Sequence, residues 1–324
     1  MTKILGIGNA LVDQLILIDN DHVLSELSLP KGSMQLVDSD TSFKVGEATA
    51  HFVSSMASGG SAANTIRGLA KLGTHASFIG HVGDDSVGNF FNDDLIESGV
   101  IPLLFRSKTP SGIAKALVTP DGERTFATFL GAAVELSEAH LDTEIFSGYD
   151  ILYIEGYLVF NSPLFLKALE LAKKAGLKIA LDLASYNVVE ANKDLLNKVI
   201  TEYVDIVFAN EEEAKALTGL DPQEALLKLA EQCDYAIVKI GAKGSIIAHK
   251  GEITLIEAFP ATPTDTTGAG DMYAAGFLHG LVNNWSIEKS GKTGSLLAAK
   301  VISVVGAKID NKQWEEIHQI IGDL

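Results

Sequence analysis

A glycine-rich segment near the C-terminus combines small residues with two aspartates. Residues 265–271 read Asp-Thr-Thr-Gly-Ala-Gly-Asp and precede a helix-compatible run over residues 272–282. Small residues at a helix start let backbone N–H groups approach an anion, so these amides can hold the oxyanion of a transferring phosphoryl group. Asp271 lies in the first turn, where it can take a proton from an attacking hydroxyl. Taken alone, a glycine-rich turn with an aspartate favoured by the helix dipole explains the same pattern.

A second glycine-rich segment shifts the balance toward phosphoryl transfer. Residues 58–64 read Ser-Gly-Gly-Ser-Ala-Ala-Asn and open a predicted helix that ends at Leu72. Gly59 and Gly60 carry no side chain, so a ligand can lie against the main chain there. Asn64 can both donate and accept hydrogen bonds toward a sugar hydroxyl. The two segments together indicate a donor phosphate on one side and an alcohol on the other.

The rest of the chain is patterned to position such loops. Apolar runs alternate with helical patterns almost throughout, which predicts a three-layer α/β/α sandwich with a mostly parallel, doubly wound sheet. Active sites of such sheets lie at the carboxyl ends of the strands. The strands are expected at residues 3–8, 75–82, 151–154, 178–182, 206–209 and 236–240.

Two stretches break this alternation, at about residues 14–50 and 109–131. The first holds short apolar segments around a Pro-Lys-Gly turn at residues 30–32, and the second reads as two strands joined by Pro-Asp-Gly at residues 120–122. Lacking crossover helices, they are expected to pair into a small inserted β-sheet that acts as a lid. We therefore expect residues 1–324 to form a single unit whose α/β core spans about residues 1–13, 51–108 and 132–324.

Composition argues against several other functions. The 324 residues carry 25 Lys and Arg against 42 Asp and Glu, a formal net charge of −17. Such an acidic chain would be repelled by nucleic-acid phosphates. No apolar run reaches about 18 residues, so we expect no membrane association and a cytoplasmic location. The single Cys233 excludes an internal disulfide, and the histidines lack metal-ligand spacing.

The two glycine-rich segments resemble the two signatures of the ribokinase-like (PfkB) carbohydrate kinase family, and the similarity covers essentially the whole chain. Within that family the likeness is greatest to adenosine kinases. Residues 6–13, Gly-Ile-Gly-Asn-Ala-Leu-Val-Asp, and residues 205–213, Asp-Ile-Val-Phe-Ala-Asn-Glu-Glu-Glu, also resemble theirs. The resemblance implies ATP-dependent transfer to the 5′-hydroxyl of a nucleoside, with adenosine converted to AMP as the leading hypothesis.

Carried over residue by residue, the resemblance implies a role for several side chains. Asp271 becomes the general base, Asp13 grips a vicinal diol, and Arg124 reaches the phosphates when the lid closes. The anion hole falls to Gly268, Ala269 and Gly270. The substrate-binding residues are Asn9, Leu11, Asp13, Gly59, Gly60, Asn64, Phe126 and Tyr157, of which Leu11, Phe126 and Tyr157 surround the base. The ATP-binding residues are Asn210, Glu213, Lys239, Gly241, Gly244 and Thr266.

The resemblance also implies ATP and Mg²⁺ as cofactors, with Glu213 acting on the magnesium indirectly. It leaves open a monovalent cation such as K⁺, and the choice between monomer and homodimer. Plainer readings also remain open: core packing for Leu11, Phe126 and Tyr157, a surface arginine on a hairpin for Arg124, a β-turn at residues 241–244, and a solvated helix start at residues 211–213.

The acceptor is the least determined part of the prediction. Residues 181–185 lack the Asp-Pro-Asn pattern common in fructokinase-like members, which argues against a ketose, but residues 31–38 depart from the typical nucleoside-site sequence. The alternatives are a sugar kinase of the same family, acting on ribose, fructose or a related furanose, and a non-catalytic nucleotide or sugar sensor.

Overall fold

A large sheet of nine strands forms the centre of the computed structural model, which describes residues 2–324. Its strands pair in parallel from β12 to β6, and β13 and β14 add an antiparallel edge. In spatial order they are β14 (Glu252–Ile256), β13 (Ser245–His249), β12 (Tyr235–Lys239), β11 (Ile206–Asn210), β10 (Lys178–Asp182), β9 (Ile151–Glu155), β1 (Lys3–Ile7), β5 (His75–Gly83) and β6 (Ile101–Ser107). The predicted doubly wound sheet is confirmed.

Helices cover both faces because successive strand residues alternate between two apolar cores. Ile4 and Tyr153 pack into one core, and their neighbours Leu5 and Leu152 pack into the other. The first core is covered by α3 (Ser61–Lys71), α4 (Ser86–Glu97), α11 (Ala269–Val282), α12 (Ile287–Val301) and α13 (Asn311–Asp323). The second is covered by α5 (Thr143–Phe146), α6 (Ser162–Lys174), α7 (Tyr186–Ala191), α8 (Lys193–Glu202), α9 (Glu211–Thr218) and α10 (Pro222–Ala230).

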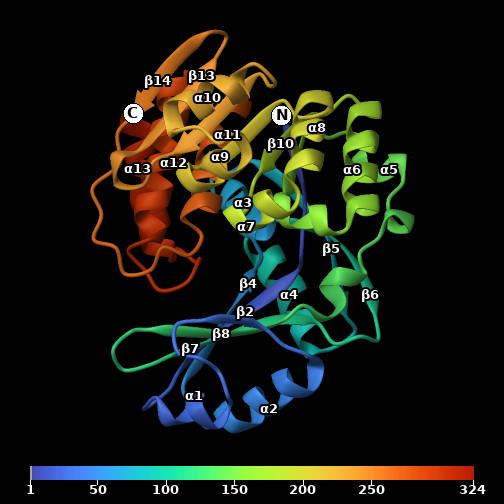
Figure 1. The fold of residues 1–324 in the computed structure, drawn as a ribbon, viewed down its shortest axis with the longest axis vertical. Coiled ribbons are helices and arrows are strands. Elements are labelled where there is room, and N and C mark those ends of the chain that lie inside the picture. The colour runs from blue at the N-terminus through green and yellow to red at the C-terminus, as the bar shows by residue number, and fades with distance from the viewer. Residues whose placement is uncertain (1) are drawn as a thin grey trace.

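A second, five-stranded sheet forms the lower body in Figure 1, together with two short helices. Its order is β3 (Met34–Leu36), β8 (Arg124–Phe129), β7 (Gly112–Val118), β2 (Leu11–Leu17) and β4 (Ser54–Gly59). Helices α1 (His22–Glu26) and α2 (Ser39–Thr49) supply Leu24 and Val45 to its own apolar cluster, which also contains Ile16 and Leu117. The predicted small sheet is thus present.

This small sheet is wider than the segments expected to form it. It also takes in residues 11–13 and 54–59, because β2 pairs with β4 and β7 from Leu11 onward. The structure also forms a helix, α2, within the first of those segments. Asp38 caps it by accepting a hydrogen bond from the Thr41 amide. Short 3₁₀ turns complete the fold at Gly131–Glu135 (η1), Glu138–His140 (η2), Gly156–Phe160 (η3) and Gly241–Lys243 (η4).

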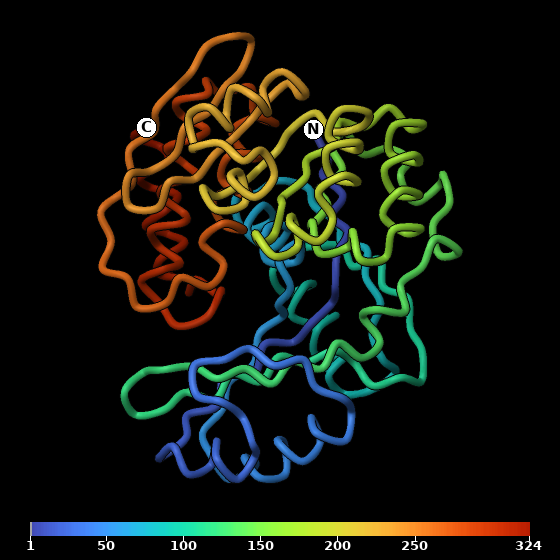
Figure 2. The backbone as a smooth tube through the Cα atoms, viewed as in Figure 1, coloured from blue at the N-terminus to red at the C-terminus, as the bar shows by residue number. Residues whose placement is uncertain are grey.

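The two sheets are joined where the glycine-rich segments lie. Figure 2 follows the dark blue N-terminal chain from the large sheet down into the small one, and β4 returns it to the start of α3. Gly60 makes that return with φ +91°, and a side chain there would collide with the backbone oxygen of Asn9. Across residues 2–324, no helix has the length and apolar character needed to cross a membrane.

Candidate active site

A cavity of about 1700 Å³ lies between the carboxyl ends of the large sheet's strands, the starts of α3 and α11, and the small sheet. It is where the strand-end rule places ligand sites in open α/β sheets. Its lining includes every residue expected at the site except Gly59, Arg124 and Phe126. The sixteen that it brings together are Asn9, Leu11, Asp13, Gly60, Asn64, Tyr157, Asn210, Glu213, Lys239, Gly241, Gly244, Thr266, Gly268, Ala269, Gly270 and Asp271.

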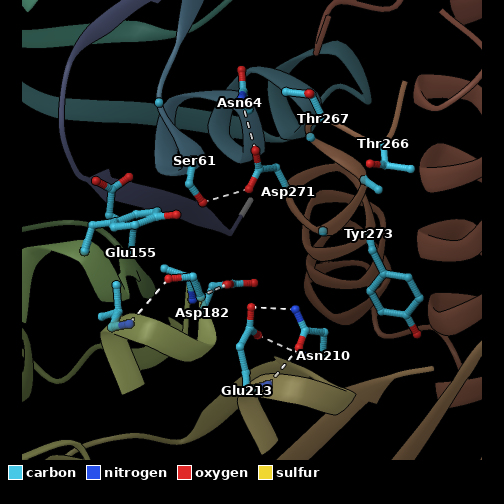
Figure 3. A pocket seen from close by; sticks show the side chains of 18 of the residues that line it. Ser61, Asn64, Glu155, Asp182, Asn210, Glu213, Thr266, Thr267, Asp271 and Tyr273 are labelled. Carbon is cyan, nitrogen blue, oxygen red and sulfur yellow. Dashed lines mark hydrogen bonds between the residues drawn. The ribbon is translucent and has the colours of Figure 1, made fainter. Parts of the chain in front are cut away.

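Asp271 lies in the first turn of α11 and faces the start of α3. Its carboxylate accepts hydrogen bonds from Ser61 Oγ at 2.7 Å and from Asn64 Nδ2 at 3.0 Å, as Figure 3 shows. Burial raises the pKa of Asp271 to about 7, although these two hydrogen bonds oppose the rise. A carboxyl group with that pKa can accept a proton near neutral pH.

The glycine loop before α11 leaves two backbone donors free. Gly268 adopts φ +77°, and a Cβ there would lie 2.7 Å from the Cβ of Ala307, so the position requires glycine. The Ala269 amide already donates to the Thr266 carbonyl at 3.2 Å. The amides of Gly268 and Gly270 have no acceptor within the described chain. They can therefore serve an anion at the helix start.

Asp13 offers unpaired carboxylate oxygens at the border between the two sheets. It packs against Gly59, where a Cβ would collide with the carboxylate, so Gly59 acts by leaving room. No group among residues 2–324 donates a hydrogen bond to it. Burial raises the pKa of Asp13 to about 6, with Arg67 opposing the rise and Asp265 adding to it. Two free acceptor oxygens suit the adjacent hydroxyls of a diol.

Glu155 holds the loop after β1 against the start of α3. Its Oε1 accepts from the backbone and side-chain nitrogens of Asn9 at 2.9 and 2.7 Å, and its Oε2 accepts from the Ala62 amide at 2.9 Å. The side chain is buried, and burial raises its pKa despite these bonds. Glu155 thereby fixes the position of Asn9 at the cavity wall.

Charged side chains at the ends of β10, β11 and β12 form the opposite wall. Lys239 Nζ donates to Asp182 Oδ2 at 3.1 Å. Burial opposes its charge, but Asp182 and Glu213 together raise the pKa of Lys239. Asn210 and Glu213 cap the start of α9 reciprocally, with both Asn210 nitrogens 2.7 Å from the Glu213 carboxylate. Burial raises the pKa of Glu213 to about 7, and Lys239 opposes the rise.

Arg124 and Phe126 do not line this cavity, although the family resemblance implied that Phe126 surrounds the base and that Arg124 reaches the phosphates when the lid closes. Both line a neighbouring cavity of about 430 Å³, which Asp13 also borders. The guanidinium of Arg124 forms an ion pair with Asp265. Asp265 also accepts from the backbone and hydroxyl of Thr267, at 3.0 and 2.8 Å. In this structure, Arg124 therefore links the small sheet to the glycine loop.

An apolar surface lies at another part of the main cavity. Met34 and Leu36 come from β3 of the small sheet, and Val134, Tyr157 and Phe160 come from the 3₁₀ turns η1 and η3. These five large side chains are between 41% and 66% exposed, although such residues are usually buried. Exposed apolar groups inside a cavity indicate a ligand with an apolar part.

Three residues of the site were not singled out from the sequence. Glu155 and Asp182 are the last residues of β9 and β10, so a search for polar groups at predicted strand ends could have found them. Ser61 lay within the glycine-rich segment, but nothing in the sequence showed that its hydroxyl faces Asp271.

Comparison with known proteins shows that the chain is a kinase. The chain belongs to the pfkB family of carbohydrate kinases, whose family model matches residues 33–314. Members are phosphotransferases that act on hydroxyl groups of sugars and nucleosides with ATP and typically Mg²⁺.

Proteins similar to this chain are named as kinases of different substrates. The chain is 29% identical over 279 residues to a 5-dehydro-2-deoxygluconokinase from Bacillus subtilis, covering 81% of this chain and 86% of that one. It is 34% identical in sequence to an adenosine kinase from Sinorhizobium meliloti. The crystal structure of that protein superposes with a TM-score of 0.86, covering 98% of this chain and 99% of that one. The chain is 32% identical to a probable sugar kinase from Rhizobium etli, whose crystal structure superposes with a TM-score of 0.87 and a coverage of 99% of each chain.

Proposed function

We propose that this kinase transfers the γ-phosphoryl group of ATP to the 5′-hydroxyl of a nucleoside, with adenosine as the leading candidate. The apolar surface in the main cavity is the observation that carries the proposal. A free sugar has little apolar area to place there, whereas a purine presents two flat faces whose stacking on an aromatic ring is worth about 1–3 kcal/mol. Tyr157 and Phe160 supply such rings. The likeness to an adenosine kinase over nearly the full length supports the same acceptor.

The polar groups between this surface and α11 suit a ribose. Asp13 would accept from the 2′- and 3′-hydroxyls, which would direct the 5′-hydroxyl toward Asp271. Asp271 would take the proton as the hydroxyl attacks phosphorus, and the amides of Gly268 and Gly270 would stabilise the charge that develops on the transferred group. Closure of the small sheet over the cavity would exclude water that could hydrolyse ATP.

The acidic wall fits a nucleotide that arrives with a divalent cation. Asp182, Glu213 and Asp271 line the cavity with Lys239, so an uncompensated polyphosphate would be repelled. Both carboxylate oxygens of Glu213 already accept hydrogen bonds from Asn210, which suits an indirect contact with Mg²⁺ through water. When bound, the ion neutralises charge on the phosphate oxygens.

One finding favours a second acceptor class. The B. subtilis relative is named for a sugar acid rather than a nucleoside. A sugar kinase would use the same Asp13, Asp271 and glycine loop, but would leave the apolar surface without a function.

Steady-state kinetics with MgATP separates these functions. The acceptors are adenosine, inosine, ribose, fructose and 5-dehydro-2-deoxygluconate, and kcat/KM is compared for each. We expect adenosine to give the highest value. A higher value for a free sugar or sugar acid contradicts the nucleoside proposal. Ligand binding without ADP formation from ATP in the presence of any of these acceptors indicates a sensor.

A pair of matched variants tests the apolar surface directly. Phe160→Ala should lower kcat/KM for adenosine about tenfold, because it removes a ring from the cavity. Phe43→Ala is the control: Phe43 is 68% exposed on α2, close to the 66% of Phe160, but does not line the cavity. It should leave kcat/KM unchanged.

A further inference from the structure

Arg67 is a buried cation on α3 that contacts Asn64, a hydrogen-bond partner of the proposed base Asp271. Only 3% of the residue is exposed. Its NH1 donates to the carbonyl and hydroxyl oxygens of Ser58 at 2.5 and 2.9 Å, and its NH2 donates to Asn64 Oδ1 at 3.1 Å and to the Ala307 carbonyl at 2.9 Å. Burying a guanidinium costs free energy unless its N–H groups are hydrogen-bonded, and these four acceptors offset that cost.

The bond to Asn64 determines which way its amide points. Arg67 can only donate, so Asn64 must present Oδ1 to it. The amide nitrogen is then directed at Asp271, where it donates to Oδ2 at 3.0 Å. Without Arg67, the amide could reverse and place its oxygen against the carboxylate, which would disfavour the ionised form of Asp271.

Arg67 is itself held in place from the side away from the cavity. Its NH1 lies 3.6 Å from Asp94, which accepts from Ser58 at 2.6 and 2.9 Å and from Lys308 at 2.5 Å. Asp94 therefore fixes the guanidinium without contacting Asn64 or Asp271 through any described hydrogen bond or ion pair.

We propose that Arg67 is a positioning residue for phosphoryl transfer: it fixes the amide of Asn64, which in turn holds Asp271 oriented and ionised. The inference rests on the proposed role of Asp271 as base, but it holds for any alcohol acceptor. It assigns a function in the reaction to a residue that neither lines the main cavity nor contacts the cavity's carboxylate directly.

Other charged or titratable groups also surround Asp271 and must be constant in the test. They are Tyr153 from β9, Tyr157 from η3, Asp182 from β10 and Lys239 from β12. Asp182 raises the pKa of Asp271 and Lys239 lowers it, and neither contacts Arg67. A variant at Arg67 leaves all four in place. Arg67→Met also removes a positive charge that acts on Asp13 and Asp271, so the charge-retaining variant Arg67→Lys is needed to separate this charge effect from the effect through Asn64.

The test compares Arg67→Met with Lys308→Met, measuring kcat/KM for the best acceptor against pH at saturating MgATP. Both variants remove a cation from Asp94, but only Arg67 contacts Asn64. Loss of a hydrogen bond to a charged group should move the acidic limb of the Arg67→Met profile upward by about one pH unit. Lys308→Met should leave the limb in place. An unmoved limb in Arg67→Met, or an equal shift in both, overturns the proposal.

A second set of variants covers the case in which Arg67→Met does not fold. Arg67→Lys keeps the charge, and it is combined with Asn64→Ala in a double-mutant cycle. If Arg67 acts through Asn64, Arg67→Lys shifts the limb in the wild-type background and adds no shift in the Asn64→Ala background. Additive shifts, or none, contradict the inference. Asp271→Asn distinguishes failure of the proposed base from failure of the positioning role. Wild-type turnover in Asp271→Asn refutes the role of Asp271 as base. If Asp271→Asn is inactive but the acidic limb does not move in the Arg67 variants, only the positioning role is refuted.

Discussion

Ser61 and Asp271 are 210 positions apart in the chain and are joined by a hydrogen bond of 2.7 Å. Ser61 is the first residue of α3, and Asp271 lies in the first turn of α11. The two glycine-rich segments therefore meet at one carboxylate, with both helix starts directed at the same place. This meeting brings the proposed acceptor side and the proposed anion loop together.

The pH dependence of the reaction should report two carboxyl groups. Because Asp271 must be ionised to accept a proton, kcat/KM for the acceptor should rise with pH through about 7 and level off above it. Asp13, with its pKa raised to about 6, must also be ionised to bind the diol. The slope of log(kcat/KM) against pH should therefore approach two below about pH 6. Asp13→Asn should restore a slope of one. A flat profile between pH 5 and 8 contradicts both assignments.

Asp13 should govern discrimination for the ribose hydroxyls. Wild type should prefer adenosine over 2′-deoxyadenosine and 3′-deoxyadenosine, because each analogue leaves a carboxylate acceptor unused. Asp13→Ala should reduce this preference by about 10- to 100-fold, the usual range for a hydrogen bond to a charged group. The measurement is the ratio of kcat/KM values. If the ratio in Asp13→Ala equals the ratio in wild type, Asp13 does not bind the diol.

Gly268 should be required for turnover beyond its effect on stability. Gly268→Ala places a side chain at φ +77° and against Ala307, which should distort the loop and lower kcat about 100-fold, as loss of one oxyanion donor does. Gly73 has φ +87°, but among residues 2–324 no atom beyond Gly73 and its chain neighbours lies within 4 Å of the position that a Cβ would take there. Gly73→Ala therefore imposes similar backbone strain without the collision. It should keep its kcat. Equal losses of kcat in both variants would make the effect one of folding alone.

Much of the fold could be predicted from the sequence because its signals are local. The strands at residues 3–8 and 178–182 are apolar runs with clear ends, and the hairpin around residues 120–122 has a recognisable turn. Helix α2 was missed because its apolar positions are few, and only the cap at Asp38 marks its start.

The contacts within the site depend on long-range pairing that no local pattern encodes. The sequence indicated Asn64 as a sugar ligand, and that role stays a prediction. The sequence did not show that its amide also contacts Arg67 and Asp271 in the fold. The resemblance implied that Arg124 reaches the phosphates when the lid closes, and that role stays a prediction; its ion pair with Asp265 became evident only in the fold. Residue types predicted the chemistry, whereas partners became evident only when the two sheets were assembled.

A single-turnover measurement on Asp271→Asn tests the central claim most directly. Rapid mixing with MgATP and the acceptor follows phosphoryl transfer itself, and calorimetry on the same variant follows acceptor binding. With the base removed but the shape of the side chain retained, transfer should slow by about 10²- to 10⁴-fold while the acceptor Kd stays within about threefold of wild type. Transfer at the wild-type rate would show that the proton leaves by another route and that Asp271 is not the base.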